Sequence, residues 1–386
     1  MQEEDLVKNW FASLALVVAV VVFGCEPSGA ADFGPYLMSL APDSVTVCWR
    51  TSSKATGKVE YGLTSALGST KELGSLSFQH EFKLTGMGPA SVYFYKVTSF
   101  AGGVKVFDSA VTSFKTGKPP VTSFKFAHMS DVHSNAKVAD YVDDIDGFGA
   151  EFVFDTGDQV TMGNSIPEWG KYFNQGLAIY SKRGLFPTLG NHQYMIEKFP
   201  YIDPKASTAV EVFANPGEEK WYTFTYGDCL FVVLDANYRT NPDVTFKQLS
   251  WLEGKLKEAT DGKDDPTFIV AGYHQPAYSS GPHAWEIDQT AWVKKAFVAK
   301  FEKYDVDLVL NGHEHLYERS VKSGVTYITV GSGSGPRKKS FPFNSYSKKL
   351  YTDGNTILLV EVVGDTLKFK AVTTTGAVVE AGTIAK

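Results

Sequence analysis

The sequence predicts an α/β layered domain preceded by a small all-β sandwich. Residues 33–117 contain strand-sized segments in which apolar and polar residues alternate with a period of two. From residue 121 to the end, apolar segments of strand length alternate instead with windows of helical period. The stiff sequence Lys118-Pro119-Pro120 separates the two patterns, so we place the domain boundary there.

The composition is that of a globular chain of about two domains. Of the 386 residues, 43% are hydrophobic and 21% are charged, which excludes a disordered, collagenous or coiled-coil protein. The formal net charge of −6 provides no basic surface. Nucleic acid is therefore not expected as the main partner, because binding to a phosphate backbone depends on clustered positive charge.

Residues 1–25 are predicted to be a signal peptide or a lipoprotein signal. Residues 11–24 are an apolar stretch of 14 residues, too short to span a bilayer but suited to the core of a signal peptide. The stretch ends at Cys25, where Val22-Phe23-Gly24-Cys25 resembles a bacterial lipoprotein cleavage site. We therefore expect export to the periplasm or cell surface, with Cys25 as a candidate lipid anchor. The alternative is an uncleaved N-terminal anchor helix, since the first ten residues carry three acids against one lysine.

The first domain is expected to be a sandwich of short strands. Five strand segments within about 85 residues, without a helical window, are typical of such a fold. The clearest segments are 44–51, 57–61, 80–84, 91–100 and 109–116. Trp49, Tyr93 and Tyr95 occupy alternating positions and are expected to lie in the core. Cys48 and Cys229 lie in apolar segments of different domains, so both are expected to be buried thiols without a disulfide.

In the second domain, several predicted strands lead directly into side chains that bind metals. The strands are expected at 124–129, 151–154, 229–234, 267–271, 306–310 and 327–330, and the helices near 138–148, 169–181, 246–259 and 290–304. Four of the strands are followed at once by metal-binding types of residue, and a Gly-Asn-His turn lies between the second and third of these. The residues are Asp131, His133, Asp158, Asn191, His192, His274, His313 and His315.

This set of side chains suits two adjacent cations. A carboxylate can bridge two ions, and imidazole nitrogens suit zinc, iron or manganese, whereas the lack of cysteine in the set disfavours a thiolate site. Two ions about 3.5–4 Å apart can hold a phosphate group and lower the pKa of an attacking water. The sequence therefore predicts hydrolysis of a phosphate ester.

Each short motif alone is mostly turn chemistry, but the ordered set D-x-H, G-D, G-N-H, H and G-H-x-H is specific. Over residues 121–386 the chain resembles the calcineurin-like metallophosphoesterase superfamily. The segment Gly312–Arg319 and the first domain, in which Val45–Arg50 and Tyr93–Val97 carry the likeness, resemble the purple acid phosphatase branch. In that branch a fibronectin type III-like domain precedes the catalytic domain, so the resemblance implies such a domain at 33–117 and a phosphoesterase domain at 121–386.

The resemblance also implies a role for each residue. Asp131, His133 and His315 would bind one ion, Asn191, His274 and His313 would bind the other, and Asp158 would bridge two ions of iron, manganese or zinc. His192 would be the general acid. His283 would contact the substrate phosphate, the alternative being a histidine in a surface loop.

Two positions depart from the purple acid phosphatase pattern. Thr161 stands where purple members have a tyrosine that binds ferric iron, so the purple colour is not expected. Gln193 stands where an acidic residue usually follows the Gly-Asn-His turn, and it is expected to alter the basicity of His192.

Other residues are assigned structural roles. His128 is expected to be a packed core histidine, and Tyr317 and Arg319 are expected to support the site without taking part in catalysis. The Gly331–Gly335 segment is expected to be a turn, because neither a Lys-Ser/Thr pair nor a helix follows it. Ser332 and Ser334 are not expected to be nucleophiles for the same reason.

The sequence thus predicts an exported binuclear-metal phosphoesterase that hydrolyses phosphate monoesters, acid phosphatase-like, by attack of a metal-activated water. Its substrate would be a small-molecule or macromolecular phosphate ester. One alternative is a phosphodiesterase on the same site. Another is a non-catalytic binding protein with a degenerate hydrolase domain, against which the complete set of seven ligand-type residues argues.

Overall fold

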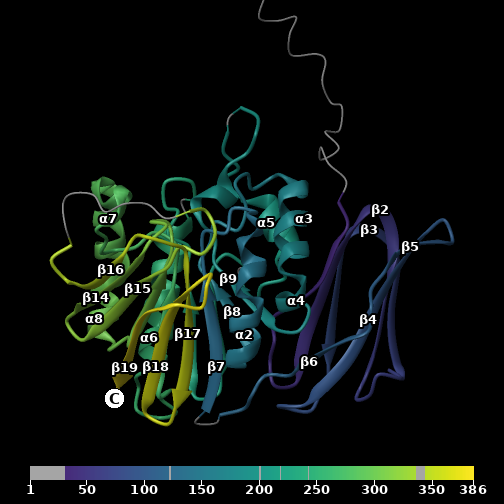
Figure 1. Cartoon of the computed structure of the whole chain (residues 1–386), viewed down its shortest axis with the longest axis horizontal. Coiled ribbons are helices and arrows are strands. Elements are labelled where there is room, and N and C mark those ends of the chain that lie inside the picture. Colours follow the sequence, from purple (N-terminus) through teal and green to yellow (C-terminus); the bar gives the residue numbers. More distant parts are fainter. Residues whose placement is uncertain (1–30, 121–122, 200, 218, 242, 336–343) are drawn as a thin grey trace, which may run out of the picture.

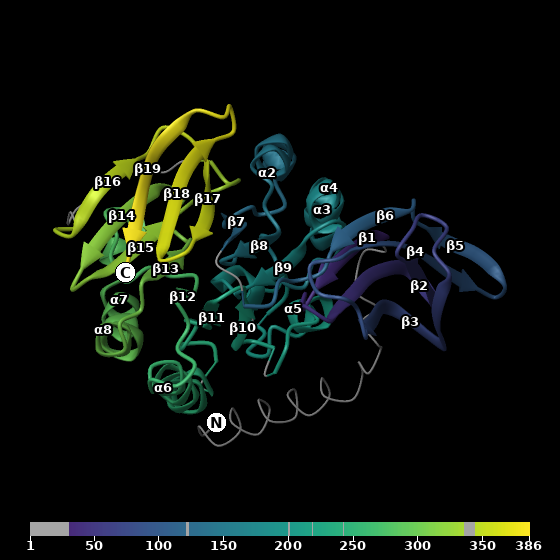
Figure 2. The same ribbon diagram turned by 90° about the horizontal axis from the view of Figure 1, so that it is seen from below.

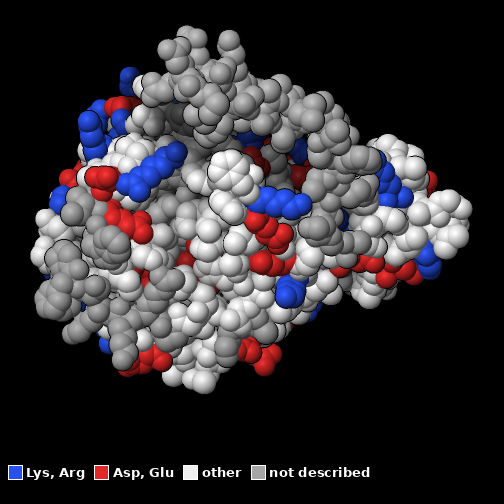
Figure 3. Space-filling view, turned by 90° about the horizontal axis from the view of Figure 1, so that it is seen from above, with Lys and Arg blue, Asp and Glu red and all other residues white. Residues whose placement is uncertain are grey.

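The computed structural model describes residues 31–386 except 121–122, 200, 218, 242 and 336–343 (Figure 1). The predicted signal at 1–25, with Cys25, lies outside the described residues. Within the described part, no helix has both the length and the apolar character needed to cross a membrane. On the face shown in Figure 3, Lys and Arg side chains are scattered among Asp and Glu side chains.

The N-terminal unit is all-β, as predicted. Its strands are β1 (Phe33–Met38), β2 (Ser44–Gly62), β3 (Ser69–Thr85), β4 (Val92–Ala101), β5 (Val104–Asp108) and β6 (Thr112–Lys115). The segments predicted as separate strands at 44–51 and 57–61 are one long strand, β2. Register shifts against β3 near Ala55 absorb the extra residues, so the pairing continues where the sequence suggests a turn.

The predicted core of this unit is confirmed for Trp49 and Tyr95, which are fully buried. Trp49 stacks on Phe82 and donates its indole N–H to the Ser99 hydroxyl at 2.8 Å. Tyr93 is only partly buried and packs against the same cluster. Cys48 and Cys229 are buried free thiols, as predicted.

The second unit contains two sheets with helices on their outer faces, as predicted. Its strands are β7 (Ser123–Met129), β8 (Phe152–Asp155), β9 (Gly184–Pro187), β10 (Tyr222–Tyr226), β11 (Cys229–Val233), β12 (Phe268–Gly272), β13 (Leu308–Asn311), β14 (Tyr317–Lys322), β15 (Val325–Thr329), β16 (Ser347–Tyr351), β17 (Thr356–Val363), β18 (Thr366–Thr373) and β19 (Val378–Ala385). The helices are α2 (Val142–Phe148), α3 (Ile166–Gln175), α4 (Leu177–Tyr180), α5 (Ser207–Val212), α6 (Leu249–Glu258), α7 (Ile287–Val293) and α8 (Ala299–Lys303).

Buried apolar side chains hold these layers together. Phe126 and Phe152 of the first sheet pack against Phe231 of the second, so the sheets share one core. A second cluster joins α3 and its neighbours to the first sheet, and a third joins α6, α7 and α8 to the second sheet. Figure 2 shows α2, α3 and α4 on one side of the sheets and α6, α7 and α8 on the other.

Strand β1 joins the two units. It pairs antiparallel with β2 of the sandwich and parallel with β9 of the second unit, in the order β19-β18-β17-β7-β8-β9-β1-β2-β4-β5. The second sheet has the order β10-β11-β12-β13-β15-β14-β16. Tyr36 of β1 also donates its hydroxyl to the carbonyl of Val212 at 2.6 Å. Because β1 pairs with a strand of each unit, the first sheet is continuous across both units.

The topology brings the predicted metal-binding loops together. β7 and β8 are parallel neighbours in the first sheet, and β12 and β13 are parallel neighbours in the second. The carboxyl ends of parallel neighbours lie at the same edge of a sheet, which is where ligand sites form in such domains. Since the sheets pack face to face, loops from both reach one site.

Candidate metal centre

Seven predicted ligands lie in loops at these strand ends. Asp131 and His133 follow β7, Asp158 follows β8, Asn191 follows β9, His274 follows β12, and the last two histidines, His313 and His315, follow β13. One group of side chains within 4.8 Å of one another consists of Asp131, His133 and His315, and another consists of Asp158, His274 and His313. The first group has the residues that the resemblance implies for one ion. The second group has two of the three residues implied for the other ion, His274 and His313, together with the implied bridging residue Asp158.

Asp158 lies at the centre of the histidines. Its Oδ2 is 3.0 Å from Nε2 of His274, 3.7 Å from Nε2 of His133 and 3.8 Å from Nε2 of His192. Its other oxygen, Oδ1, accepts the backbone N–H of His192 at 3.0 Å. One carboxylate oxygen therefore faces histidines of both groupings, which is the position of a bridging ligand.

The site contains buried polar atoms that have no hydrogen-bond partner among the described residues. A buried polar atom without a partner costs free energy, so several converging on one point indicate a ligand that the protein side chains do not supply. They are Oδ1 of Asp131, Nε2 of His133, Oδ1 of Asn191 and Nε2 of His313. The donor set is all oxygen and imidazole nitrogen, which fits zinc, iron or manganese.

Hydrogen bonds fix which nitrogen of two histidines faces the site. Nδ1 of His274 lies 2.8 Å from the carbonyl oxygen of Thr156, and a carbonyl can only accept, so Nδ1 carries the proton. The lone pair of Nε2 is thereby available to a metal, an arrangement common among metal-binding histidines. Nδ1 of His315 lies 2.8 Å from the hydroxyl of Ser334, which orients that ring.

The loops hold their ligands in a backbone conformation that residues other than glycine rarely adopt. The φ angles of Asp131, His133, Asp158, His313 and His315 lie between 48° and 74°, in the left-handed region. Such residues cost free energy and cluster at functional sites. Backbone bonds from Asp131 to Gly157 and from His133 to Asp158 tie the first two loops together.

Glycines next to the ligands leave no space for a side chain. A Cβ on Gly190 would lie 2.1 Å from Oδ1 of Asp158. A Cβ on Gly312 would lie 1.8 Å from the Ser130 hydroxyl and 2.5 Å from Oδ2 of Asp131. The Gly-Asn-His and Gly-His-x-His motifs therefore need glycine for close packing against the carboxylates.

The buried charges shift the pKa values of the ligands. Burial opposes ionisation of Asp131, but His315 and His274 outweigh it and lower the pKa of this carboxyl to about 2. Burial likewise opposes charge on His274, whereas Asp158 and Asp131 raise its pKa to about 9. Burial lowers the pKa of His133. Without cations, the carboxylates thus hold a proton on His274, which a metal ion would displace.

His192 lies at the edge of the site rather than in its centre. Its Nδ1 is 2.6 Å from the carbonyl oxygen of Thr161, and its ring meets the ring of His133 edge to face with centroids 4.5 Å apart. Its side chain is 23% exposed, whereas those of Asp131 and Asp158 are 0% and 2% exposed. A substrate entering from solvent can therefore reach Nε2 of His192.

His283 also lies beside the predicted ligands. Its ring centroid is 4.2 Å from that of His313, and its backbone N–H donates to Glu314. Sequence reasoning missed Glu286, whose Oε2 is 3.6 Å from Nε2 of His313. His283, Glu286 and His313 form a further group of potential ligands. Nothing in the sequence near Glu286 marks it, because it follows a 3-10 turn and not a strand.

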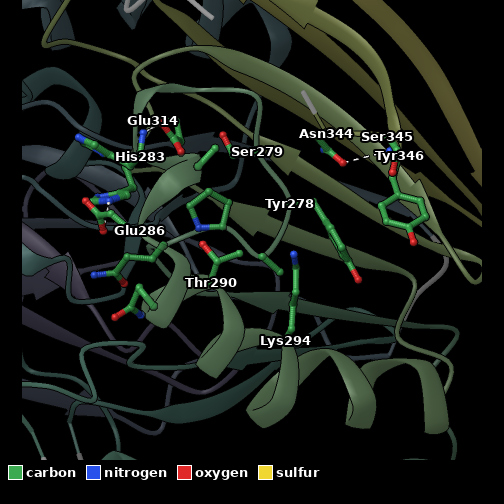
Figure 4. Close-up of a pocket in the computed structure, with 16 residues that line it drawn as sticks. Tyr278, Ser279, His283, Glu286, Thr290, Lys294, Glu314, Asn344, Ser345 and Tyr346 are labelled. Atoms are coloured by element: carbon green, nitrogen blue, oxygen red, sulfur yellow. Dashed lines mark hydrogen bonds and ion pairs between the residues drawn. The ribbon is translucent and has the colours of Figure 1, made fainter. Parts of the chain in front are cut away.

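A cavity of about 180 Å³ opens next to this edge of the site (Figure 4). Its lining includes the three residues just named together with side chains from the loop after β12, from α7, from the start of the π-helical segment that follows α7, and from the residues just before β16. They include Tyr278, Thr290, Lys294, Asn344 and Tyr346.

Two neighbouring loops make contacts that the sequence did not predict. Gln193 was expected to alter the basicity of His192, but its amide oxygen accepts the backbone N–H groups of Asp158 and Gly190 at 2.9 and 2.8 Å. It holds the two loops together, and the Thr161 carbonyl is the group that contacts the His192 ring. The Gly331–Gly335 segment, predicted to be a turn, is irregular with a bend at 333–334, and its Ser334 orients His315.

The other structural predictions agree with the contacts. His128 is fully buried, its Nε2 lies 2.9 Å from the Thr156 hydroxyl, and burial lowers its pKa to about 3. Tyr317 and Arg319 both donate to the carboxylate of Glu380 on β19, which links the two sheets.

Comparison with known proteins agrees with this geometry. A family model described as calcineurin-like phosphoesterase matches residues 124–317, half of the chain. The chain is 26% identical over 326 residues to probable purple acid phosphatase 20 of Arabidopsis thaliana, covering 77% of this chain and 73% of that protein. Its identity to purple acid phosphatase 15 of the same plant is 24% over 300 residues, covering 67% of this chain and 54% of the other.

Solved structures share the fold. The purple acid phosphatase PPD1 from yellow lupin has a TM-score of 0.75 at 17% identity, covering 92% of this chain and 74% of that one. PhoD has a TM-score of 0.68 at 13% identity, and the match covers 94% of this chain and 90% of the PhoD chain.

The fold and the site together define a metal-dependent phosphoesterase. The chain belongs to the calcineurin-like phosphoesterase family, and the resemblance to purple acid phosphatases seen in the sequence is confirmed. The family implies a binuclear metal centre, and the unpartnered buried atoms of this site fit one.

Proposed function

We propose that this protein hydrolyses phosphate monoesters at a binuclear metal centre held by Asp131, His133, Asp158, Asn191, His274, His313 and His315. The observation that carries the proposal is the convergence of ligand atoms from both sheets around Asp158, with several of them lacking a protein partner among the described residues. When bound, two cations would neutralise the phosphate oxygens and lower the pKa of the attacking water. Iron, manganese and zinc all suit the donor set.

His192 is proposed as the general acid. The Thr161 carbonyl keeps the proton on Nδ1, so a second proton on Nε2 makes the ring a cation that can donate to the leaving oxygen. Its side chain is partly exposed, so the leaving oxygen of an ester bound at the metal centre can reach it. His283 is proposed to contact the phosphate, because its ring lies beside that of the ligand His313.

A phosphodiesterase remains the second candidate on the same site. The two activities are distinguished by assaying the purified, metal-analysed protein against matched mono- and diesters across pH. The proposal expects two metals per chain and a higher kcat/KM for monoesters than for diesters at acidic pH. A higher kcat/KM for diesters would establish the alternative. Absence of hydrolysis with two metals bound would favour a degenerate binding protein.

We also propose that the protein is exported. The 14-residue apolar stretch and Cys25 support this proposal, because they resemble a lipoprotein signal. Cell fractionation of the full chain beside its Cys25→Ser variant tests both parts. An anchored protein would leave the membrane fraction when Cys25 is replaced, whereas a protein found in the cytoplasm in both cases would contradict export.

A further inference from the structure

The cavity beside the candidate metal centre has two chemically different ends. At one end lie His283, Glu286 and His313, which adjoin the candidate metal ligands. At the other end lie Lys294 and Tyr278, and Figure 4 shows Thr290 between the two ends. A phosphate bound at the metal centre would therefore direct its ester group along this cavity.

Lys294 provides a positive charge without a carboxylate partner in the described part of the chain. It is the one lysine or arginine among the described residues that line the cavity. Its ammonium lies 5.0 Å from the centroid of the Tyr278 ring, a cation–π contact. By contrast, the nearby Lys322 is paired with Glu302. Among the described residues that line the cavity, Lys294 is therefore the free cation.

The acidic residues of the cavity are already engaged at the metal end. Glu314 accepts the backbone N–H of His283 at 3.0 Å, and Glu286 lies 3.6 Å from His313. Lys294 is exposed overall, but partial burial lowers the pKa of its ammonium, and the charge of Lys322 lowers it further. A cation in that situation is stabilised by an anion placed beside it.

The walls near Lys294 are partly aromatic. Tyr278 and Tyr346 meet edge to face with ring centroids 5.1 Å apart. Thr290 lies four positions before Lys294 on the same helical segment, so both side chains are on one face, and both line the cavity. The volume of about 180 Å³ accommodates a compact group.

We propose that this cavity binds the leaving group of the substrate, and that Lys294 pairs with a second anionic group on that leaving group. The substrate class is then a compact phosphomonoester that carries a carboxylate or a second phosphate. This inference rests on the proposed monoesterase function and specifies its substrate. Lys294 is a specificity residue here, since the metal ligands and His192 perform the chemistry.

Binding of non-hydrolysable probes tests the proposal. We would titrate the metal-loaded full chain with phenylphosphonate, 4-carboxyphenylphosphonate and 1,4-phenylenebisphosphonate. The wild type should bind one or both doubly anionic probes about two- to fivefold more tightly than phenylphosphonate, the range of a partly exposed ion pair. Lys294→Met should remove that preference and Lys294→Arg should retain most of it. Lys295→Met is the matched control, because Lys295 is exposed like Lys294 but lies outside the cavity lining.

The three probes also identify the second anion. A preference for the carboxylate probe alone or the bisphosphonate alone assigns the group, and either supports the proposal. Equal binding of all three by the wild type, or a preference that persists in Lys294→Met, would overturn it. Failure to bind any probe would overturn it as well.

Assays with the corresponding phosphate esters separate this inference from the function on which it rests. If the wild type hydrolyses phenyl phosphate but prefers neither the carboxylated ester nor the ester with a second phosphate, the substrate inference fails alone. If it hydrolyses no monoester, the proposed function fails with it.

Discussion

Nδ1 of His192 lies 2.6 Å from the carbonyl oxygen of Thr161. A carbonyl accepts but cannot donate, so this contact holds the proton on Nδ1 and turns Nε2 toward the metal centre, 3.8 Å from Asp158. The neighbouring Asn191 presents a buried, unpartnered oxygen on the same turn. One turn thus supplies both a candidate ligand and a candidate proton donor.

Replacing His192 with alanine is expected to leave the metal content intact and to slow catalysis. General-acid assistance is typically worth about 10²–10⁴-fold in kcat. The loss should be of that size for alkyl phosphates, whose leaving groups need a proton, and much smaller for nitrophenyl phosphate. Metal analysis and kcat for both substrates check this. If the variant loses metal, or slows both substrates equally, His192 is a ligand or a phosphate anchor instead.

The iron-loaded protein is expected to lack the strong visible absorption of a tyrosinate–iron bond. Thr161 occupies the tyrosine position, and the hydroxyl of the buried Tyr194 donates to Asp235 instead. Thr161→Tyr should introduce absorption, because it places a phenol where purple members have the tyrosine that binds iron. The backbone carbonyl that holds His192 is kept in this variant. A purple wild-type protein would show that another tyrosine coordinates iron and that the ligand set is wrong.

Gly190→Ala is expected to abolish binding of at least one metal ion. The added Cβ would lie 2.1 Å from the Asp158 carboxylate and would displace it. Gly254→Ala in α6 is the matched control, since a Cβ there meets no atom within 4 Å among the described residues and alanine stabilises a helix by roughly 0.5–1 kcal/mol. Metal analysis of both variants checks the result. Full metal content in Gly190→Ala would contradict the packing seen here.

Asp155 should make stability fall as pH rises. Burial raises the pKa of this carboxyl from its ordinary value to about 7. The folded state then binds more protons than the unfolded state between about pH 4 and pH 7, so the free energy of unfolding decreases across that interval by up to about 4 kcal/mol. Asp155→Asn removes this group. Denaturant unfolding at pH 5 and pH 8 should show a smaller decrease in the free energy of unfolding for the variant than for the wild type. An equal decrease in both proteins would contradict the raised pKa of Asp155.

Much of the site could be predicted from the sequence because its residues follow strands. The position of Asp131 just after an apolar segment, and of His313 just after another, indicates strand-end loops at one edge of each sheet. The chemistry of carboxylate and imidazole then indicates metals. The layered fold follows from the same alternation of segments, and the family match agrees with it.

The rest depends on contacts between distant segments, which local patterns do not encode. Strand β9 has only four residues and includes Gly184 and Pro187, so it has no strand signature, yet it pairs with β8 and β1. Glu286 and Ser334 were missed for a similar reason. Each lies in an irregular segment and reaches the site only after the sheets have packed.

The metal content of the wild type and of Asp158→Ala tests the central claim most directly. Oδ2 of Asp158 faces histidines of both groupings, so removing this carboxylate should disrupt both ion sites. The predicted result is about two transition-metal ions per wild-type chain, as expected for a two-metal hydrolase, and loss of both ions in the variant. A wild type that binds a single ion, with activity unchanged in Asp158→Ala, would contradict the account.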